Sequence, residues 1–219
     1  MTEKKIAAII TMGQAGSETR DVTAALPNAV VRHYGILDGM TLEDVKREVW
    51  PEGDENFIVT NLADGTNVRV SEKQAMERAN ACLARAENEK ASAALILCTG
   101  HFKPIETKMT VLTPERVIFA LLGAMQVRKL GVIVPEPEQI SLTLDYYAQF
   151  CPIARAASPY GDMKHIESAA RIFANEDVDL ILSDCMGFTR EMGGIIGRSS
   201  GKNVFVPRVV LPALLNSMI

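Results

Sequence analysis

Apolar runs of strand length alternate with helix-like segments along almost the whole chain, and this alternation is the strongest constraint on the fold. Several runs are apolar at nearly every position, which is typical of parallel strands covered by helices on both faces. The sequence therefore predicts an α/β fold with a mostly parallel sheet. The expected strands are 5–11, 28–37, 91–100, 129–135, 152–158, 178–185 and 203–208.

The segments between these runs have helical caps and spacing. Thr41 is a plausible N-cap with Asp44 three residues later, and an apolar stripe at helical spacing runs from Ala75 to Ala86. One segment differs, because Asp64-Gly65 lies between two β-rich runs and predicts a hairpin over 57–71. The expected helices are 41–50, 71–90, 113–127, 137–150, 163–176 and a last one from Val209.

Composition excludes several classes of protein. Apolar residues make up 47% of the 219 residues and charged residues 23%, which does not indicate disorder. The net charge of -4 and the scattered basic residues argue against nucleic-acid binding. No apolar run approaches the roughly 20 residues of a membrane span. The four dispersed cysteines are expected to be reduced thiols in a cytoplasmic protein.

Two cysteines follow similar apolar runs, "LILCTG" around Cys98 and "LILSDCMG" around Cys185. Ligands of parallel α/β sheets bind at the carboxyl ends of strands, so both thiols lie at functional ends. Each cysteine precedes a turn expected to open toward a helix, and Thr189 is the expected N-cap after Met186-Gly187. Free N–H groups there would bind a carboxylate and lower a thiol pKa. The two thiols could serve as base and acid on opposite faces of one carbon. The competing interpretation is two small buried side chains.

The turn after the first strand, "TMGQAGSETRDV", is a second candidate ligand site. Gly13 would let the backbone approach a ligand closely, while Thr11, Gln14 and Ser17 offer neutral donors. Arg20 offers a guanidinium group that could bind a carboxylate through two parallel hydrogen bonds. An ordinary β–α turn remains the alternative.

The other motifs give weaker indications of function. The stretch 197–203, "GRSSGKN", lacks the spacing of a phosphate loop and is expected to be a surface loop. Cys98 and His101 form a C-x-x-H pair without the further ligands that zinc needs, so the sequence predicts no metal. His101 is either a polar group of the cleft or solvent-exposed. Glu138 is expected in the first turn of a helix, where acids are favoured, with a cleft-facing position as the alternative.

The pieces "TMGQ", "RDV", "GILDGMT", "LILCTGHF", "GVIVPEPEQ" and "LILSDCMGFT" occur in an order that resembles the AroM family, which is allied to the aspartate/glutamate racemase superfamily. The resemblance implies two pseudo-symmetric α/β lobes with a ligand cleft between them, and the last helix returning to the first lobe. The lobes would be 1–105 with 208–219, and 106–207. Racemases of this superfamily use one cysteine per lobe and no cofactor, and those positions look like Cys98 and Cys185.

The resemblance also implies residues that hold the substrate carboxylate. These would come from the first β–α turn and from the turns after each cysteine: Thr11, Gly13, Gln14, Thr99, Gly100 and Thr189. Arg20 and Gly187 complete the candidate set that we predict from the turns themselves. This chain has Met186-Gly187 where the racemases tend to have Thr-His, so a histidine that often assists the thiol is missing.

Two hypotheses follow. The first is a cofactor-independent racemase or isomerase that acts on a small carboxylate through Cys98 and Cys185. The second is a non-catalytic protein that binds or senses a small anion in the same cleft, and the missing histidine motivates it. The expected partner is a small carboxylate, with neither nucleic acid nor membrane, and a homodimer stays open.

Overall fold

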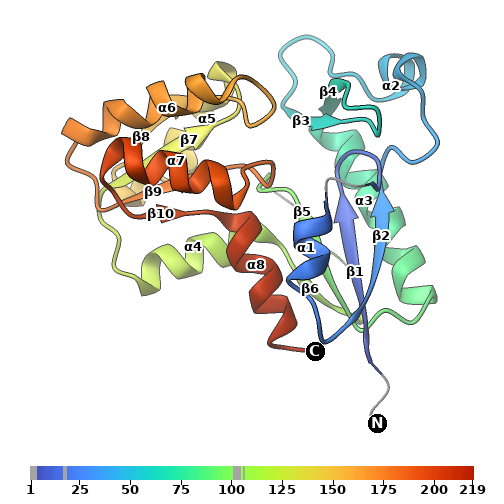
Figure 1. Ribbon diagram of the computed structural model, residues 1–219. Helices are drawn as coiled ribbons and strands as arrows, with labels where there is room; N and C mark the ends of the chain where they lie inside the picture. The colour runs from blue at the N-terminus through green and yellow to red at the C-terminus, as the bar shows by residue number, and fades with distance from the viewer. Residues whose placement is uncertain (1–3, 17–18, 101–104, 106) are drawn as a thin grey trace. The chain divides into compact units, whose positions relative to one another are not determined.

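The computed structural model describes residues 4–16, 19–100, 105 and 107–219 (Figure 1). Contacts between Cα atoms divide the chain into two compact units, 1–115 with 211–219 and 116–210. The chain passes from one unit to the other within two helices, α4 (Pro114–Ala124) and α8 (Pro207–Asn216). The α/β fold class predicted from the sequence is confirmed.

The first unit is built on a four-stranded parallel sheet in the order β2-β1-β5-β6. Its strands are β1 (Ile6–Thr11), β2 (Val30–Gly35), β5 (Ala93–Leu97) and β6 (Thr110–Leu112). Every residue of β5 is buried, as expected for a strand covered on both faces. The helices are α1 (Arg20–Ala24), α2 (Leu42–Glu48) and α3 (Glu72–Asn88).

Helix α3 packs on one face of this sheet, and α2 joins the same hydrophobic core through Val45. The predicted stripe of α3 is confirmed, because Ala75, Ala79, Leu83 and Ala86 are buried in one core with Ile10 and Ile96 of the central strands. Thr41 caps α2 as predicted, and its hydroxyl accepts a hydrogen bond from the Asp44 N–H. The sequence pattern thus gives both helices their position and their first residue.

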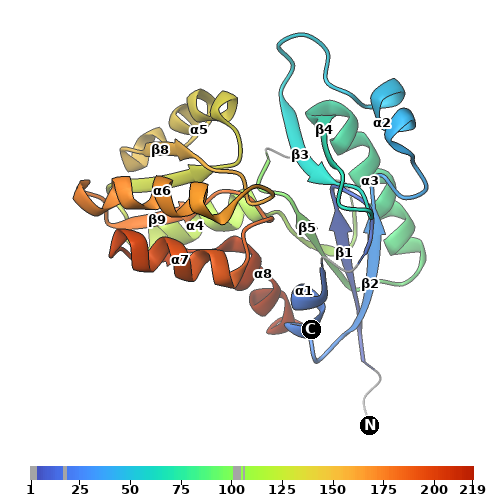
Figure 2. The ribbon, with the colours of Figure 1, turned by 45° about the horizontal axis from the view of Figure 1, so that its top comes forward.

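A separate two-stranded antiparallel hairpin lies between α2 and α3 in the sequence. It consists of β3 (Phe57–Asn61) and β4 (Asn67–Ser71), and both views show it beside α2 and one end of α3 (Figures 1 and 2). The predicted turn is present, with Gly65 at φ +86° and the Asp64 carboxylate accepting a hydrogen bond from the Thr66 N–H.

The second unit repeats the topology of the first. Its sheet has the order β10-β9-β7-β8, so that β7 (Leu130–Val134), β8 (Ile153–Ala156), β9 (Leu180–Ser183) and β10 (Val204–Phe205) occupy the places of β1, β2, β5 and β6. All its strand pairs are parallel. This is the pseudo-symmetry that the resemblance implied.

Helices cover both faces of the second sheet. On one face, α6 (Met163–Ile172) and α7 (Arg190–Ser200) pack through Ile166 and Ile196 against Ile133 and Ile181. On the other, Ile118 of α4 packs with the residues around α5 (Ile140–Tyr146). Short 3-10 turns, Pro137–Gln139, Ala148–Phe150 and Phe173–Asn175, flank α5 and follow α6.

Two expectations need correction. The expected surface loop 197–203 is helical as far as Ser200, and Gly201 ends α7 in the left-handed conformation at φ +68°. The last helix begins at Pro207 rather than Val209, because proline is favoured in the first turn. The Cys185 turn leads into α7 as expected, whereas the expectation of a helix after the Cys98 turn concerns residues that include 101–104 and 106, which lie outside the described part of the chain. None of the described helices has the length and apolar character needed to cross a bilayer.

Candidate functional site

The two predicted thiols stand at equivalent positions of the two sheets. Cys98 directly follows β5, and Cys185 lies two residues after β9. Because β9 occupies in its sheet the place that β5 occupies in the other, each unit presents one thiol at the carboxyl end of the same strand. Cys98 is buried and Cys185 is half-buried.

The turns behind the two thiols share one hydrogen bond. The N–H of Gly100 donates to Sγ of Cys98 over 3.3 Å, and the N–H of Gly187 donates to Sγ of Cys185 over the same distance. Each turn therefore reads Cys-x-Gly, with a backbone donor positioned to stabilise a thiolate. Sequence comparison of the two apolar runs did not reveal this shared contact.

The Gly187 position has no room for a side chain. A Cβ there would stand 2.8 Å from Cγ of Pro159 and 2.8 Å from the hydroxyl oxygen of Tyr160. Both residues follow β8, so the loop after this strand packs directly over the Cys185 turn. Glycine is therefore required by close approach rather than by backbone conformation.

The Cys185 thiol has a perturbed pKa. Burial raises the pKa of Cys185 to about 11, and the charge of Asp184 acts in the same direction. The Gly187 N–H, a hydrogen bond from the Tyr160 hydroxyl and the charge of Arg208 lower this pKa, but burial outweighs them. The expectation that the turn lowers the thiol pKa is thus wrong in its net direction, although the predicted N–H contributes with the expected sign.

Tyr160 and Arg208 contact the Cys185 turn and were not predicted from the sequence. Arg208, at the start of α8, donates from Nη1 to the carbonyl oxygen of Met186 over 2.9 Å and so holds the turn from its other side. Tyr160 had a usable signal, because it follows the carboxyl end of a parallel strand. Arg208 had none, since it follows a strand only two residues long and faces the turn through tertiary packing.

The turn after β1 is tied to two other loops through Gln14. Its side-chain amide donates to the carbonyl oxygens of Leu37 (3.1 Å) and Met40 (2.7 Å), and its oxygen accepts from the Ala63 N–H (2.7 Å). These bonds use both amide hydrogens, so Gln14 fastens the loop after β2 and the β3–β4 turn to the turn after β1.

The same turn approaches the hairpin closely at Gly13. A Cβ at this position would stand 2.2 Å from the carbonyl oxygen of Asn61, so only glycine fits. The Asp38 carboxylate accepts hydrogen bonds from the N–H groups of Ala15 (2.8 Å) and Gly35 (2.9 Å), which joins the loop after β2 to this turn a second time.

Thr11 ends β1, and its hydroxyl oxygen is buried with no hydrogen-bond partner in the described part of the chain. A buried hydroxyl without a partner costs free energy unless a ligand or water satisfies it. Arg20 is the exposed first residue of α1 and makes no side-chain hydrogen bond or ion pair with the residues described. Both remain available to a ligand.

The remaining predicted residues are distributed as follows. Thr99 and Gly100 are half-buried in the turn after β5. Thr189 caps α7, where its hydroxyl accepts a hydrogen bond from the Met192 N–H over 3.3 Å. Glu138 is exposed in the 3-10 turn Pro137–Gln139. Ser17 and His101 lie outside the described residues.

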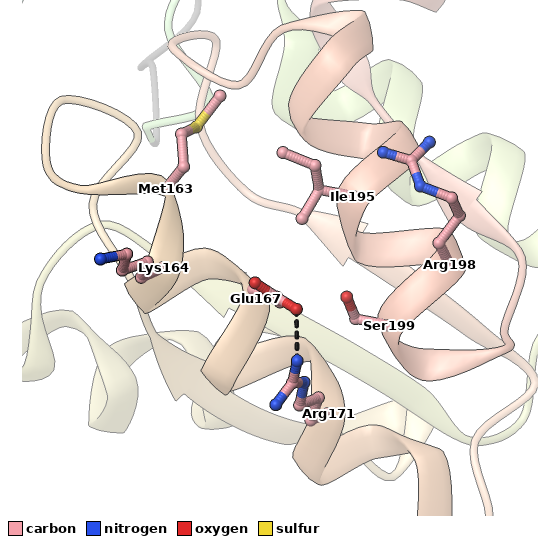
Figure 3. A pocket seen from close by; sticks show the side chains of 7 residues that line it. All are labelled: Met163, Lys164, Glu167, Arg171, Ile195, Arg198 and Ser199. Atoms are coloured by element: carbon pink, nitrogen blue, oxygen red, sulfur yellow. Dashed lines mark hydrogen bonds and ion pairs between the residues drawn. The ribbon is translucent and has the colours of Figure 1, made fainter.

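Two further features were searched for, a possible metal site and a surface groove, and neither includes the predicted residues in the described part of the chain. The described residues contain no group of three or more His, Cys, Asp or Glu side chains that could hold a metal ion. A groove of about 530 Å³ lies between α6 and α7, where Glu167 pairs with Arg171 (Figure 3). All of its lining residues belong to these two helices, so it is separate from the Cys185 turn.

Comparisons with known proteins agree with this architecture. A family model described as AroM protein matches residues 7–219. No curated protein sequence matches the chain. Glutamate racemase from Francisella tularensis subsp. tularensis SCHU S4, solved in complex with D-glutamate, superposes with a TM-score of 0.65 at 12% identity, covering 98% of this chain and 81% of that one.

Two further solved structures have the same fold. Arylmalonate decarboxylase superposes with a TM-score of 0.62 at 15% identity, covering 97% of this chain and 92% of that one. The maleate isomerase Iso from Pseudomonas putida S16 superposes with a TM-score of 0.61 at 13% identity, covering 98% of this chain and 93% of that one. With the family match over nearly the whole length, the chain belongs to the AroM family and has the fold of the Asp/Glu racemase superfamily.

Proposed function

We propose that this protein is a cofactor-independent enzyme of the racemase or isomerase type, which moves protons at a carbon next to a carboxylate through Cys98 and Cys185. The observation that carries the proposal is the repeated Cys-x-Gly turn. Each unit places one thiol at the end of the equivalent strand, with a glycine N–H 3.3 Å from the sulfur. A pair of similar thiols suits a reaction that takes a proton from one face of a carbon and returns one to the other.

The raised pKa of Cys185 supports a division of roles between the two thiols. With a pKa near 11, Cys185 is a protonated thiol at neutral pH and serves as the acid. Cys98, as a thiolate, takes the proton from the carbon, and the C–H electron pair delocalises into the substrate carboxylate. Cys185 then donates its proton to the opposite face, so that one proton leaves and one enters. The reverse reaction restores both sulfurs to their starting states.

The carboxylate would be held by the turns around the two thiols. Among the described residues, the buried Thr11 hydroxyl has no hydrogen-bond partner and the Arg20 guanidinium makes no hydrogen bond or ion pair. We assign Gln14 a positioning role, because its amide hydrogens are already donated within the turn. The other proposed contacts are Gly13, Thr99, Gly100, Gly187 and Thr189. The solved relatives include a glutamate racemase bound to D-glutamate, which is consistent with a small carboxylate.

Hydrogen exchange in deuterated water tests the proposal. Each enantiomer of a panel of small carboxylic acids is incubated with the protein, and α-deuterium and stereochemistry are read by NMR and chiral chromatography. The wild-type protein exchanges and inverts its substrate. Cys185→Ala exchanges one enantiomer without inversion, because only Cys98 still serves its face, and Cys98→Ala does the same with the other enantiomer.

Cys151→Ser is the matched control, because Cys151 is an exposed thiol outside both turns. It should exchange and invert like the wild-type protein. If no acid acquires α-deuterium, or if the variants of Cys98 and Cys185 behave like the control, proton transfer by these thiols is ruled out.

One observation favours a second candidate, a non-catalytic protein that binds a small anion. The raised pKa of Cys185 keeps its thiol un-ionised, and no assisting histidine follows it. Labelling all cysteines with iodoacetamide at several pH values discriminates the two. Tight binding of an anion together with two thiols of low reactivity supports a binding protein, whereas selective labelling of Cys98 at neutral pH supports the enzyme.

A further inference from the structure

The groove between α6 and α7 belongs to the second unit, and none of its lining residues has a part in the proposed function. Residues 107–219 are described without a gap, so every side chain of that unit is known. The volume of about 530 Å³ lies within the range of small-molecule sites, which is roughly 300–1,000 Å³. The groove is therefore large enough for a small ligand.

Two apolar side chains line the groove, one from each helix. Met163 is the first residue of α6 and Ile195 lies in the middle of α7, and Figure 3 shows both toward the same end of the groove. Both are half-buried. The core beneath these helices takes Ile166 and Ile196, so Ile195 is turned toward the groove instead. This end of the groove can bury the apolar part of a ligand.

The groove carries a positive charge on a chain that is negative overall. Its charged lining residues are three basic ones and one acidic one, which leaves +2, whereas the formal net charge of the chain is -4. Arg171 pairs with Glu167 four residues earlier, so these two charges compensate each other. The excess therefore comes from Lys164 of α6 and Arg198 of α7.

These two cationic groups are available to a ligand. The ammonium of Lys164 and the guanidinium of Arg198 make no hydrogen bond or ion pair with any residue in the described ranges. Arg198 folds back along α7, because its Nη1 is 3.1 Å from the point where a Cβ of Gly194 would stand. The absent side chain at Gly194 thus leaves room for the guanidinium beside the helix. Ser199 adds a hydroxyl to the same wall.

We propose that this groove binds a phosphate monoester with an apolar body. The phosphate would accept hydrogen bonds from Lys164, Arg198 and Ser199, and the apolar part would lie against Met163 and Ile195. A phosphate monoester carries nearly two negative charges at neutral pH, since its second pKa is about 6, and this matches the +2 of the lining. Because the groove is separate from the thiol turns, this site is independent of the proposed function.

Isothermal titration calorimetry of the full chain with hexyl phosphate tests the role of charge. The wild-type protein should bind this probe, and Arg198→Gln should weaken the affinity by about three- to tenfold, as expected for one charged contact at an exposed site. Arg128→Gln is the matched control, because Arg128 is an exposed arginine between α4 and β7 that does not line the groove. It should keep the wild-type affinity. No binding by the wild-type protein, or equal affinities in the two variants, overturns the proposal.

Protection of an introduced thiol tests where the probe binds. Ser199→Cys is labelled with iodoacetamide, and peptide mass spectrometry gives the rate at position 199. Hexyl phosphate at four times the Kd of this variant should slow that rate by about fivefold, by mass action, while the exposed Cys151 keeps its rate.

Two partial probes test the ligand class. At the same concentration, 1-hexanol and inorganic phosphate should protect position 199 much less than hexyl phosphate, because each has only one half of the recognised chemistry. An unchanged rate with hexyl phosphate, or equal protection by either partial probe, overturns the proposal. Neither readout depends on turnover, so the deuterium-exchange experiment judges the proposed function separately.

Discussion

The hydrogen bond from Tyr160 to Cys185 gives a prediction whose size follows from the structure. Tyr160→Phe removes a donor to the sulfur while keeping the ring that packs over Gly187. A hydrogen bond to a charged group contributes about 1.5–3 kcal/mol, which corresponds to roughly 1–2 units of thiol pKa. The pKa of Cys185, already near 11, should therefore rise further in the variant.

Alkylation kinetics measure this change at pH 9. The thiolate fraction should fall by about 10- to 100-fold, while the greater basicity of the sulfur recovers nearly half of the effect on a logarithmic scale. The net rate of iodoacetamide labelling at Cys185 should thus fall by about 3- to 12-fold, as read by peptide mass spectrometry. Tyr34→Phe is the control, because this buried tyrosine donates to Glu89 in the other unit, 3.0 Å away. A labelling rate equal to that of the control, or faster than wild type, would refute the reasoning.

Three further predictions concern stability. Asp38→Ala should lower the free energy of unfolding in urea by about 1–3 kcal/mol, because two N–H groups lose a charged acceptor; an unchanged midpoint would contradict this. Since the folded pKa of Cys185 exceeds the ordinary thiol value of 9.0, the unfolded state ionises first, and stability should fall between about pH 9 and 11 by roughly 3 kcal/mol more in the wild-type protein than in Cys185→Ser. Parallel pH curves for these two proteins would disprove it. Gly187→Ala should cost about 1–3 kcal/mol through overpacking against the loop after β8, measured by thermal unfolding, and a variant as stable as wild type would show that this loop yields freely.

Local patterns were sufficient to predict most of the regular elements. The central strands are apolar at nearly every position, so their place needed no tertiary information. The stripe of α3, the Thr41 cap and the turn at Gly65 were likewise encoded within a few residues. Helix α1 was missed because its five residues bury only Val22 and leave little periodic signal.

The site was less accessible to sequence reasoning. Strand ends located Cys98 and Cys185, since the carboxyl ends of parallel strands are functional positions. The contacts of Tyr160 and Arg208 depend on how loops far apart in the sequence pack together, which no local pattern contains. The net pKa of Cys185 was predicted in the wrong direction for the same reason, because burial is a tertiary property.

The β3–β4 hairpin is an additional element of the first unit, which the second unit, described in full, lacks between its corresponding strands β8 and β9. It has its own ladder, so insertions, deletions or exchanges within it leave the register of the four-stranded sheet unchanged. Yet it meets the turn after β1 at Asn61 and Ala63 and leads directly into α3. A change in the hairpin can therefore alter the surroundings of the turn after β1 while the four parallel strands of the unit keep their pairing.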